Sequence, residues 1–181
     1  MNPDSTSPSS LSREAIAGLP EGTRRVLDAA ARLGLDAEVR ERAAAGSLAE
    51  AAALMGIPTG SLVKTLVVRR HDGSYLLALI PGGRKISWAK LRTAVGVNRL
   101  SLPSAELALE ATGFERGTIT PLGSHTDWPI FADAGLGALA PGARIGLGAG
   151  AHGYGLMVEA APLLAATGAI LADISDPEES A

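Results

Sequence analysis

The stretch Ser61–Pro81 constrains the fold of this chain more than any other. Apolar and β-branched residues dominate Val63 to Arg70, a turn follows at 71–74, and a second apolar run extends from Tyr75 to Ile80. Two such runs around a turn that contains Gly73 predict a β-hairpin. Because both runs are apolar almost throughout, we expect the hairpin to be buried on both faces, at the centre of a small α/β domain.

Lys64 stands near the start of the first run, between Val63 and Thr65. Burial of an unpaired ammonium costs much free energy, so this side chain must reach water or a polar pocket. Its position alone leaves two interpretations open: a lysine that marks the edge of the sheet, or a group that contacts a ligand.

Length and composition narrow the class of protein. A chain of 181 residues is long enough for one domain with a sizeable core. The absence of cysteine excludes disulfides and thiolate metal sites and is typical of a reducing compartment. The N-terminus lacks the basic and apolar regions of a secretory signal, and no apolar run is long enough to span a bilayer. We therefore expect a cytoplasmic protein without a membrane segment.

Serine caps and glycine stops divide the rest of the chain into short elements. Helices are predicted to begin at Ser47, Ser87 and Ser104, and each ends at a glycine. Short apolar runs predict strands between them, which gives hairpins and separate helices rather than regular βαβ winding. The Ser- and Pro-rich residues 1–12 are expected to be disordered, and the acidic residues 176–181 are expected to form a frayed tail.

Charge is unevenly distributed although the net charge is only −3. The segment from Leu62 to Arg99 contains eight basic residues and one acidic residue, Asp72. Such a segment is either a surface that faces phosphate or a solvated rim. The basic residues are Lys64, Arg69, Arg70, Arg84, Lys85, Lys90, Arg92 and Arg99.

Residues Gly148–Gly153 satisfy the pattern G-x-G-x-x-G after an apolar run. That pattern is typical of an enzyme that binds a dinucleotide, but it requires a long helix next. Here Tyr154, Leu156 and Val158 alternate with other residues, and Pro162 would interrupt a helix. The pattern therefore favours a glycine-rich hairpin that lets a backbone or a ligand approach closely.

A long loop from Phe114 to Asp127 lacks any helical or strand period. Loops of this length in compact domains are often functional. Its glycines free backbone N–H groups to face a ligand oxygen. His125 in this loop is either a general base or a solvent-exposed histidine. The three histidines lack the spacing of metal ligands, so neither a metal nor a cofactor is predicted.

Taken in order, several segments resemble the YbaK/ProX family of aminoacyl-tRNA deacylases, which are related to the editing domain inserted in bacterial prolyl-tRNA synthetases. The matching segments are Lys64–Val68, Leu79–Gly82, Thr112–Gly113, Gly117–Gly123, Asp133 and Gly148–Gly150. The resemblance spans Leu35 to Ile174. It implies an α/β (mixed α+β) single domain over residues 13–175, with a curved, mostly antiparallel mixed sheet flanked by helices.

The resemblance also implies an activity and a site. The activity is trans-editing: hydrolysis of the ester in mischarged aminoacyl-tRNA, of the tRNA-Pro or tRNA-Cys type, with the tRNA acceptor end as partner. Lys64 falls on the family's catalytic lysine and Asp133 on its pocket aspartate, although Ala134–Gly135 replaces the usual polar neighbours. The remaining implied substrate-binding residues are Gly117, Thr118, Ile119, Pro121, Gly123 and Gly148.

Three classes remain open at this point. The first is the trans-editing hydrolase, and the second is a non-catalytic member of the same fold that binds tRNA or aminoacyl-tRNA. The third is an unrelated nucleotide-binding enzyme that uses Gly148–Gly153. Because no protein base is obvious, a water directed by the substrate's own 2′-hydroxyl group is the expected nucleophile. Both a monomer and a homodimer are compatible with the sequence.

Overall fold

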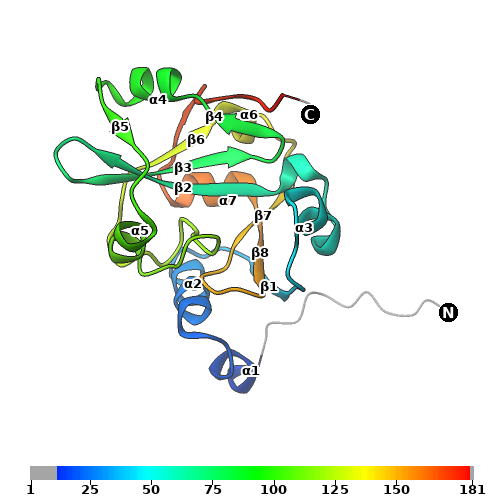
Figure 1. Cartoon of the computed structure of the whole chain (residues 1–181). Helices are drawn as coiled ribbons and strands as arrows, with labels where there is room; N and C mark the ends of the chain where they lie inside the picture. Colours follow the sequence, from blue (N-terminus) through cyan, green and yellow to red (C-terminus); the bar gives the residue numbers. More distant parts are fainter. Residues whose placement is uncertain (1–11, 180–181) are drawn as a thin grey trace.

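The computed structural model of the chain describes residues 12–179 (Figure 1). The helices are α1 (Arg13–Ala17), α2 (Glu21–Arg32), α3 (Leu48–Met55), α4 (Trp88–Val95), α5 (Ala105–Thr112), α6 (Ala134–Gly137) and α7 (Ala160–Ala166), with a 3₁₀ turn, η1, at Thr59–Ser61. The strands are β1 (Ala37–Glu41), β2 (Val63–Arg70), β3 (Tyr75–Pro81), β4 (Arg84–Ile86), β5 (Leu100–Ser101), β6 (Ile130–Asp133), β7 (Arg144–Gly148), β8 (Tyr154–Glu159), β9 (Ile170–Ala172) and β10 (Ser175–Pro177). The predicted disorder at 1–12 lies outside the described residues except for Ser12, which caps α1.

The strands form three hydrogen-bonded sheets, which together give the expected mixed α/β fold. The largest has the order β5-β2-β3-β6-β9, in which β3, β6 and β9 are parallel to one another. The order of the second is β1-β8-β7, all antiparallel, and β10 pairs with β4 in the third. A parallel bridge between Leu62 and Gly146 joins the start of β2 to β7, so the first two sheets continue into each other at this point.

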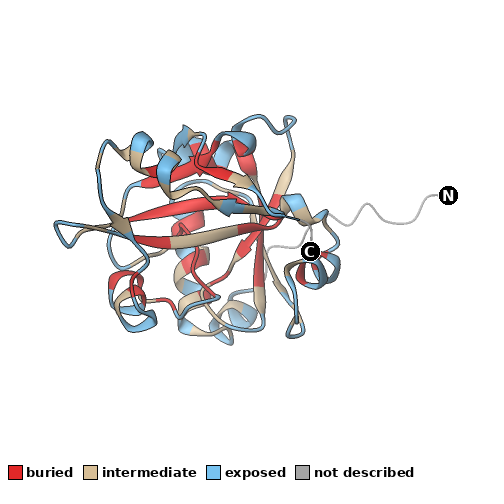
Figure 2. Ribbon diagram, turned by 45° about the horizontal axis from the view of Figure 1, so that its top comes forward, coloured by how far each residue is buried: buried red, intermediate tan, exposed pale blue. Residues whose placement is uncertain are grey.

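The predicted hairpin is confirmed as β2 and β3, paired from Val63 with Pro81 to Arg69 with Tyr75. Leu77 and Leu79 pack into the main core, whereas Leu76 and Ile80 face a second core cluster that includes Leu91 of α4. Both faces of β3 are therefore buried, because helices and the second sheet cover one face while α4 covers the other (Figures 1 and 2).

Local capping explains where the helices around the hairpin begin and end. The hydroxyl oxygens of Ser47, Ser87 and Ser104 accept hydrogen bonds from backbone N–H groups of the first turns of α3, α4 and α5. Each of these helices ends at a glycine with a left-handed backbone, as the sequence predicts. In a capping box the Glu50 carboxylate would accept from the backbone N–H of Ser47, the N-cap residue. Here it accepts instead from Gly46 N at 2.7 Å.

Two short strands differ from the prediction. The sequence predicted no strand at 84–86 and a frayed tail at 176–181. Instead, Arg84–Ile86 pairs antiparallel with Ser175–Pro177, and Glu178 N donates to Gly83 O at 2.9 Å. The described C-terminal segment is thus part of the fold. Within residues 12–179, no helix is long and apolar enough to cross a membrane.

Candidate functional site

A cleft of about 560 Å³ opens along the free edge of β2, between α3 and the segment that follows β5. It forms because β2 pairs with β5 only at Arg69 and Arg70, which leaves the edge from Val63 to Val67 uncovered. A volume of this size suits a small organic group. The apolar part of its lining comprises Ala45, Leu48, Ala51, Met55, Leu62, Val63, Leu66, Val67, Leu102, Pro103, Ala108, Ile119 and Leu147.

The charged residues that line the cleft are all basic: Arg42, Lys64 and Arg116. No carboxylate occurs in this lining as far as the described residues show. The Nε atom of Arg42 is buried without a hydrogen-bond partner within residues 12–179, while Arg116 donates to Pro103 O at 3.1 Å. An apolar floor with basic groups around it favours a ligand that carries both an uncharged part and a negative charge.

The predicted loop forms one wall of this cleft through Gly117 and Ile119. Gly117 adopts φ +90°, a conformation that side-chain-bearing residues rarely adopt. Thr118 is buried and turned inward: its backbone N–H and its hydroxyl both donate to Glu115 O. The N–H of Thr118 is therefore occupied and is not available to a ligand in this structure.

Gly148 and Gly150 hold this loop against the β7–β8 hairpin. Gly150 N donates to Thr118 O at 2.9 Å, and a Cβ on Gly148 would lie 2.5 Å from Ile119 O. The glycine-rich segment thus allows two backbones to approach closely, as predicted. The strands on either side of it, β7 and β8, are antiparallel, whereas a dinucleotide-binding unit would have a helix in place of β8.

Lys64 lines the cleft, and its ammonium group already has hydrogen-bond partners within the fold. It shares the face of β2 with Leu66 and Val68, which pack toward the second core cluster. Its Nζ donates to Arg84 O at 2.6 Å and pairs with Glu178 at 2.9 Å. The Lys64 side chain is 30% exposed.

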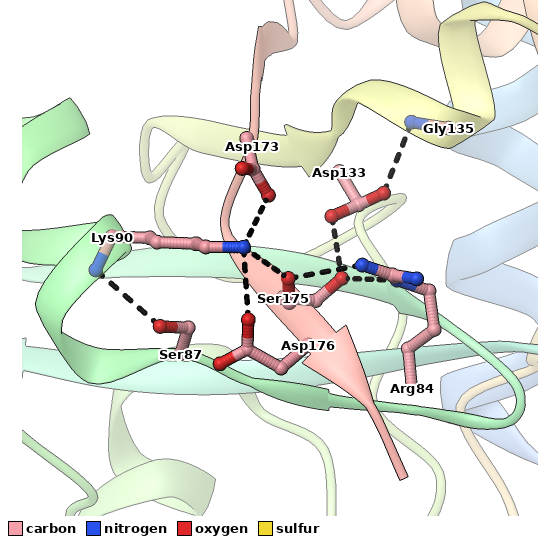
Figure 3. A network of polar contacts seen from close by, with 8 residues as sticks. All are labelled: Arg84, Ser87, Lys90, Asp133, Gly135, Asp173, Ser175 and Asp176. Carbon is pink, nitrogen blue, oxygen red and sulfur yellow. Dashed lines mark hydrogen bonds and ion pairs between the residues drawn. The ribbon is translucent and has the colours of Figure 1, made fainter.

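Asp133 lies outside the cleft lining, in a buried polar cluster beside β10 (Figure 3). Its Oδ1 accepts from Gly135 N at 3.0 Å, which caps α6, and its Oδ2 accepts from the Ser175 hydroxyl at 2.6 Å. Arg84 Nε in turn donates to Ser175 Oγ at 2.6 Å. Asp133 therefore connects β6, β4 and β10 in this structure.

Lys90 ties α4 to the same C-terminal segment. Its ammonium contacts Asp176 at 2.8 Å and Asp173 at 3.0 Å (Figure 3). The hydrogen bonds that Lys90 donates to Asp176 and Asp173 raise the pKa of Lys90, and the hydrogen bond donated by Lys90 lowers the pKa of Asp176. Three of the eight basic residues between Leu62 and Arg99 are thus engaged by β10 and its flanks.

The other predicted residues lie farther along the loop. Pro121 and Gly123 line a different cleft, beside Trp128. A Cβ on Gly123 would lie 2.8 Å from Arg25 O, and Arg25 Nε donates to Gly123 O at 2.7 Å, so this part of the loop is fastened to α2. Of the predicted site residues, the structure brings Lys64, Gly117, Ile119 and Gly148 together around one cleft.

Sequence reasoning missed Arg42 and Arg116, because the signal it used, the basic segment 62–99, contains neither. Arg42 reaches the cleft through the pairing of β1 with β8, where its N–H donates to Gly153 O. His125 is exposed and does not line the cleft, whereas His152 pairs with Glu115 at 3.1 Å on the outer side of the loop. In the part of the chain that the structure describes, no three His, Asp or Glu side chains are placed to hold a metal ion.

The chain is similar to a known domain family and to two proline–tRNA ligases. Residues 42–165 match the model of the aminoacyl-tRNA editing domain family. The chain is 28% identical over 94 residues to proline–tRNA ligase of Trichlorobacter lovleyi and 36% identical over 92 residues to that of Nitratidesulfovibrio vulgaris. The first alignment covers 52% of this chain and the second 51%, and each covers 16% of the ligase. The chain thus matches about a sixth of each ligase's length.

Solved structures of this fold cover nearly the whole domain. A crystal structure described as a candidate trans-editing enzyme for prolyl tRNA synthetase superposes with a TM-score of 0.78 at 30% identity, over 88% of this chain and 99% of that one. The hypothetical protein APE2540 superposes with a TM-score of 0.76 at 26% identity, over 84% of this chain and 99% of that one. With the family model matching more than half of its length, the chain belongs to the aminoacyl-tRNA editing domain family.

Proposed function

We propose that the protein is a hydrolase that deacylates mischarged aminoacyl-tRNA and that the cleft beside β2 holds the aminoacylated 3′ end. The observation that carries the proposal is the composition of the cleft: an apolar floor with Arg42, Lys64 and Arg116 and no lining carboxylate among the described residues. The terminal nucleotide brings phosphate to these cations, and the floor receives an uncharged amino-acid side chain.

In this proposal the loop and the lysine position the ester. Lys64 binds the terminal phosphate as a point charge after exchanging Glu178 for it. The N–H groups of Gly117 and Ile119, on the cleft wall, are the candidates to donate to the carbonyl oxygen as it becomes an oxyanion. Thr118 N is not a candidate, because it donates to Glu115 O.

The reaction is an attack of water on the ester carbonyl carbon. The bond between that carbon and the ribose oxygen breaks, the ribose oxygen takes up a proton, and the free amino acid leaves. The vicinal hydroxyl group of the substrate assists the water, since the described lining residues include no histidine or carboxylate that could act as a base. Positioning of water and ester supplies much of the acceleration.

A panel of mischarged tRNAs, including those of the tRNA-Pro and tRNA-Cys type, tests the proposal with wild-type and Lys64→Ala protein. We expect deacylation of at least one substrate and a loss of roughly a hundredfold in Lys64→Ala, comparable with the removal of one preorganised electrostatic group. Lys85→Ala is the matched control, because Lys85 is exposed on β4 and does not line the cleft.

The alternative is a protein of the same fold that binds aminoacyl-tRNA without hydrolysing it. Tight binding of every substrate with no hydrolysis above the uncatalysed rate would favour this alternative. Full activity in a folded Lys64→Ala protein would contradict the role of the lysine.

A further inference from the structure

The basic segment divides into two parts with different surroundings. Lys64, Arg84 and Lys90 contact Glu178, Ser175 and the aspartates next to β10. Four arginines instead gather at the opposite end of β2, where they line a second cleft of about 570 Å³. This arginine cluster consists of Arg69 and Arg70 on β2, Arg92 on α4, and Arg99 before β5.

Secondary structure assembles the arginine cluster from three elements. Arg69 pairs with Ser101 and Arg70 with Leu100, so the start of β5 lies directly beside the end of β2. Arg92 is in the last turn of α4, and the chain turns at Gly96 to reach Arg99. Figure 1 shows this path from α4 down to β5 beside the β2–β3 hairpin.

None of the four arginines forms an ion pair within the described part of the chain; the nearest acid in sequence is Asp72, whose pKa is lowered by hydrogen bonds from Ser74 and to a smaller extent by the charges of His71 and Arg70. The lining of this cleft includes no Asp or Glu. Asp72, in the adjacent turn, uses its Oδ1 to accept from the backbone and the hydroxyl of Ser74. The Nε of Arg70 is buried with no hydrogen-bond partner within residues 12–179. Four guanidinium groups held together in a cleft without a lining carboxylate favour an anion from outside the domain.

The chemistry of this cleft favours phosphate in a nucleic-acid backbone. A guanidinium group presents a planar set of donors that matches phosphate oxygens. The described lining contains no Phe, Tyr or Trp and a single His, His71, as a ring on which an unpaired base could stack. Its four guanidinium groups all suit phosphate, so contact with a duplex backbone fits better than recognition of single-stranded bases.

The two clefts are neighbours along the same strands. Val67 lines the first cleft and Arg69 the second, and likewise Leu102 lines the first and Ser101 the second. Two residues along a strand correspond to about 7 Å. A ligand whose end occupies the first cleft therefore extends over the arginine cluster if its chain continues in this direction.

We propose that the arginine cluster binds the phosphate backbone of the duplex stem of a tRNA whose aminoacylated 3′ end occupies the first cleft. This inference rests on the proposed function for its substrate. It adds a binding surface that lies away from the reacting ester and that acts without reading sequence.

The test compares the double variant Arg69→Gln/Arg99→Gln with the control Arg24→Gln/Arg32→Gln. Arg69 and Arg99 are exposed, so their replacement should leave the fold intact, which thermal unfolding verifies. The control removes two equally exposed arginines from α2, which lies on the other side of the sheet from α4 (Figure 1). The net charge changes by the same amount in both.

The first measurement is the affinity for an RNA hairpin that carries no amino acid. The hairpin consists of an acceptor stem with its single-stranded 3′ end, and the salt concentration is varied between about 50 and 200 mM. Each phosphate contact contributes roughly 0.9 to the slope of log K against log salt. We expect the Arg69/Arg99 variant to lose about 1.8 from the slope and roughly tenfold in affinity, and the control to keep both. An unchanged slope, an equal change in the control, or no RNA binding by the wild type would overturn the proposal.

The second measurement separates this proposal from the proposed function. The Arg69/Arg99 variant should raise KM roughly tenfold for full-length aminoacyl-tRNA. It should leave hydrolysis of an aminoacylated trinucleotide, which lacks the stem, unchanged. Equal losses on both substrates would overturn the proposal, because the cluster would then act on the first cleft itself. If no substrate is hydrolysed, the proposed function fails while the RNA-binding measurement still decides the role of the cluster.

Discussion

The contact between Glu178 and Lys64 predicts that the C-terminal segment competes with the substrate. Glu178 Oε1 lies 2.9 Å from Lys64 Nζ, the group proposed to bind the terminal phosphate. In Glu178→Gln the charge is removed, while Lys64 keeps its hydrogen bond to Arg84 O. An incoming phosphate then no longer has to displace a carboxylate, so substrate affinity should rise.

The size of the effect follows from the exposure of the pair. Two unit charges 2.9 Å apart in water attract by about 1.4 kcal/mol. The Lys64 and Glu178 side chains are 30% and 47% exposed, and pairs of this kind contribute about 0.2–1 kcal/mol when measured. This range corresponds to a gain in affinity of roughly 1.4- to 5-fold, by the relation between free energy and equilibrium constant.

Steady-state deacylation at low ionic strength measures this effect as a decrease in KM. Glu179→Gln is the matched control, since it makes the same charge change one residue later at an exposed position. We expect KM to fall in Glu178→Gln, to stay unchanged in Glu179→Gln, and to become equal in the two variants at high salt.

Two results would refute this reasoning. An equal decrease in KM in both variants would mean that net charge, rather than the contact with Lys64, sets the affinity. An increase in KM in Glu178→Gln would mean that the carboxylate holds the ammonium in its working position.

Three further predictions concern stability and ionisation. Gly148→Ala should lower the free energy of unfolding by about 1–3 kcal/mol, because the new Cβ would lie 2.5 Å from a loop carbonyl oxygen, whereas Gly60→Ala, with open space around it, should not; urea unfolding compares them. Asp133→Ala should cost about 1–3 kcal/mol for each of the two donors left without an acceptor, and equal stability to wild type in the same assay would contradict its role in the polar cluster. Because Lys90 lowers the pKa of Asp176, their ion pair should persist at pH values above the ordinary aspartate pKa of 3.8 and be lost as the pH falls through the lowered pKa. An NMR titration in which Lys90→Gln leaves the pKa of Asp176 unchanged would show that Lys90 does not cause the shift.

The elements that the sequence predicted are those with local signals. The hairpin follows from two apolar runs around a glycine turn, and the serine caps with their glycine stops mark three helices. The alternation after Gly153 also distinguished a second hairpin from a nucleotide-binding helix. Each of these signals lies within about ten residues of the structure that it specifies, so no knowledge of distant contacts is needed.

The features that the sequence did not predict depend on contacts between distant segments. The pairing of β4 with β10 joins two three-residue strands without strong β propensity, and Arg84 and Ser175 are 91 residues apart. Nothing in the sequence near Arg84 indicates that its guanidinium group is hydrogen-bonded within the fold. The sequence therefore suggested a single basic surface, whereas the structure divides these residues between the surroundings of β10 and the arginine cluster. Arg42 is equally remote, because its place at the cleft depends on the pairing of β1 with β8.

The late position of β10 in the chain also bears on folding during synthesis. Arg84 and Asp133 emerge from the ribosome well before Ser175, the residue that joins them. Closing so long a loop is slow compared with forming a hairpin, so we expect the β2–β3 hairpin to form first and the polar cluster last. Pulse-labelled hydrogen exchange would show protection of the Gly82 N–H, which donates to Leu62 O across the hairpin, before that of the Glu178 N–H, which donates to Gly83 O. A nascent chain that has not yet docked β10 would then present Lys64 without its carboxylate partner.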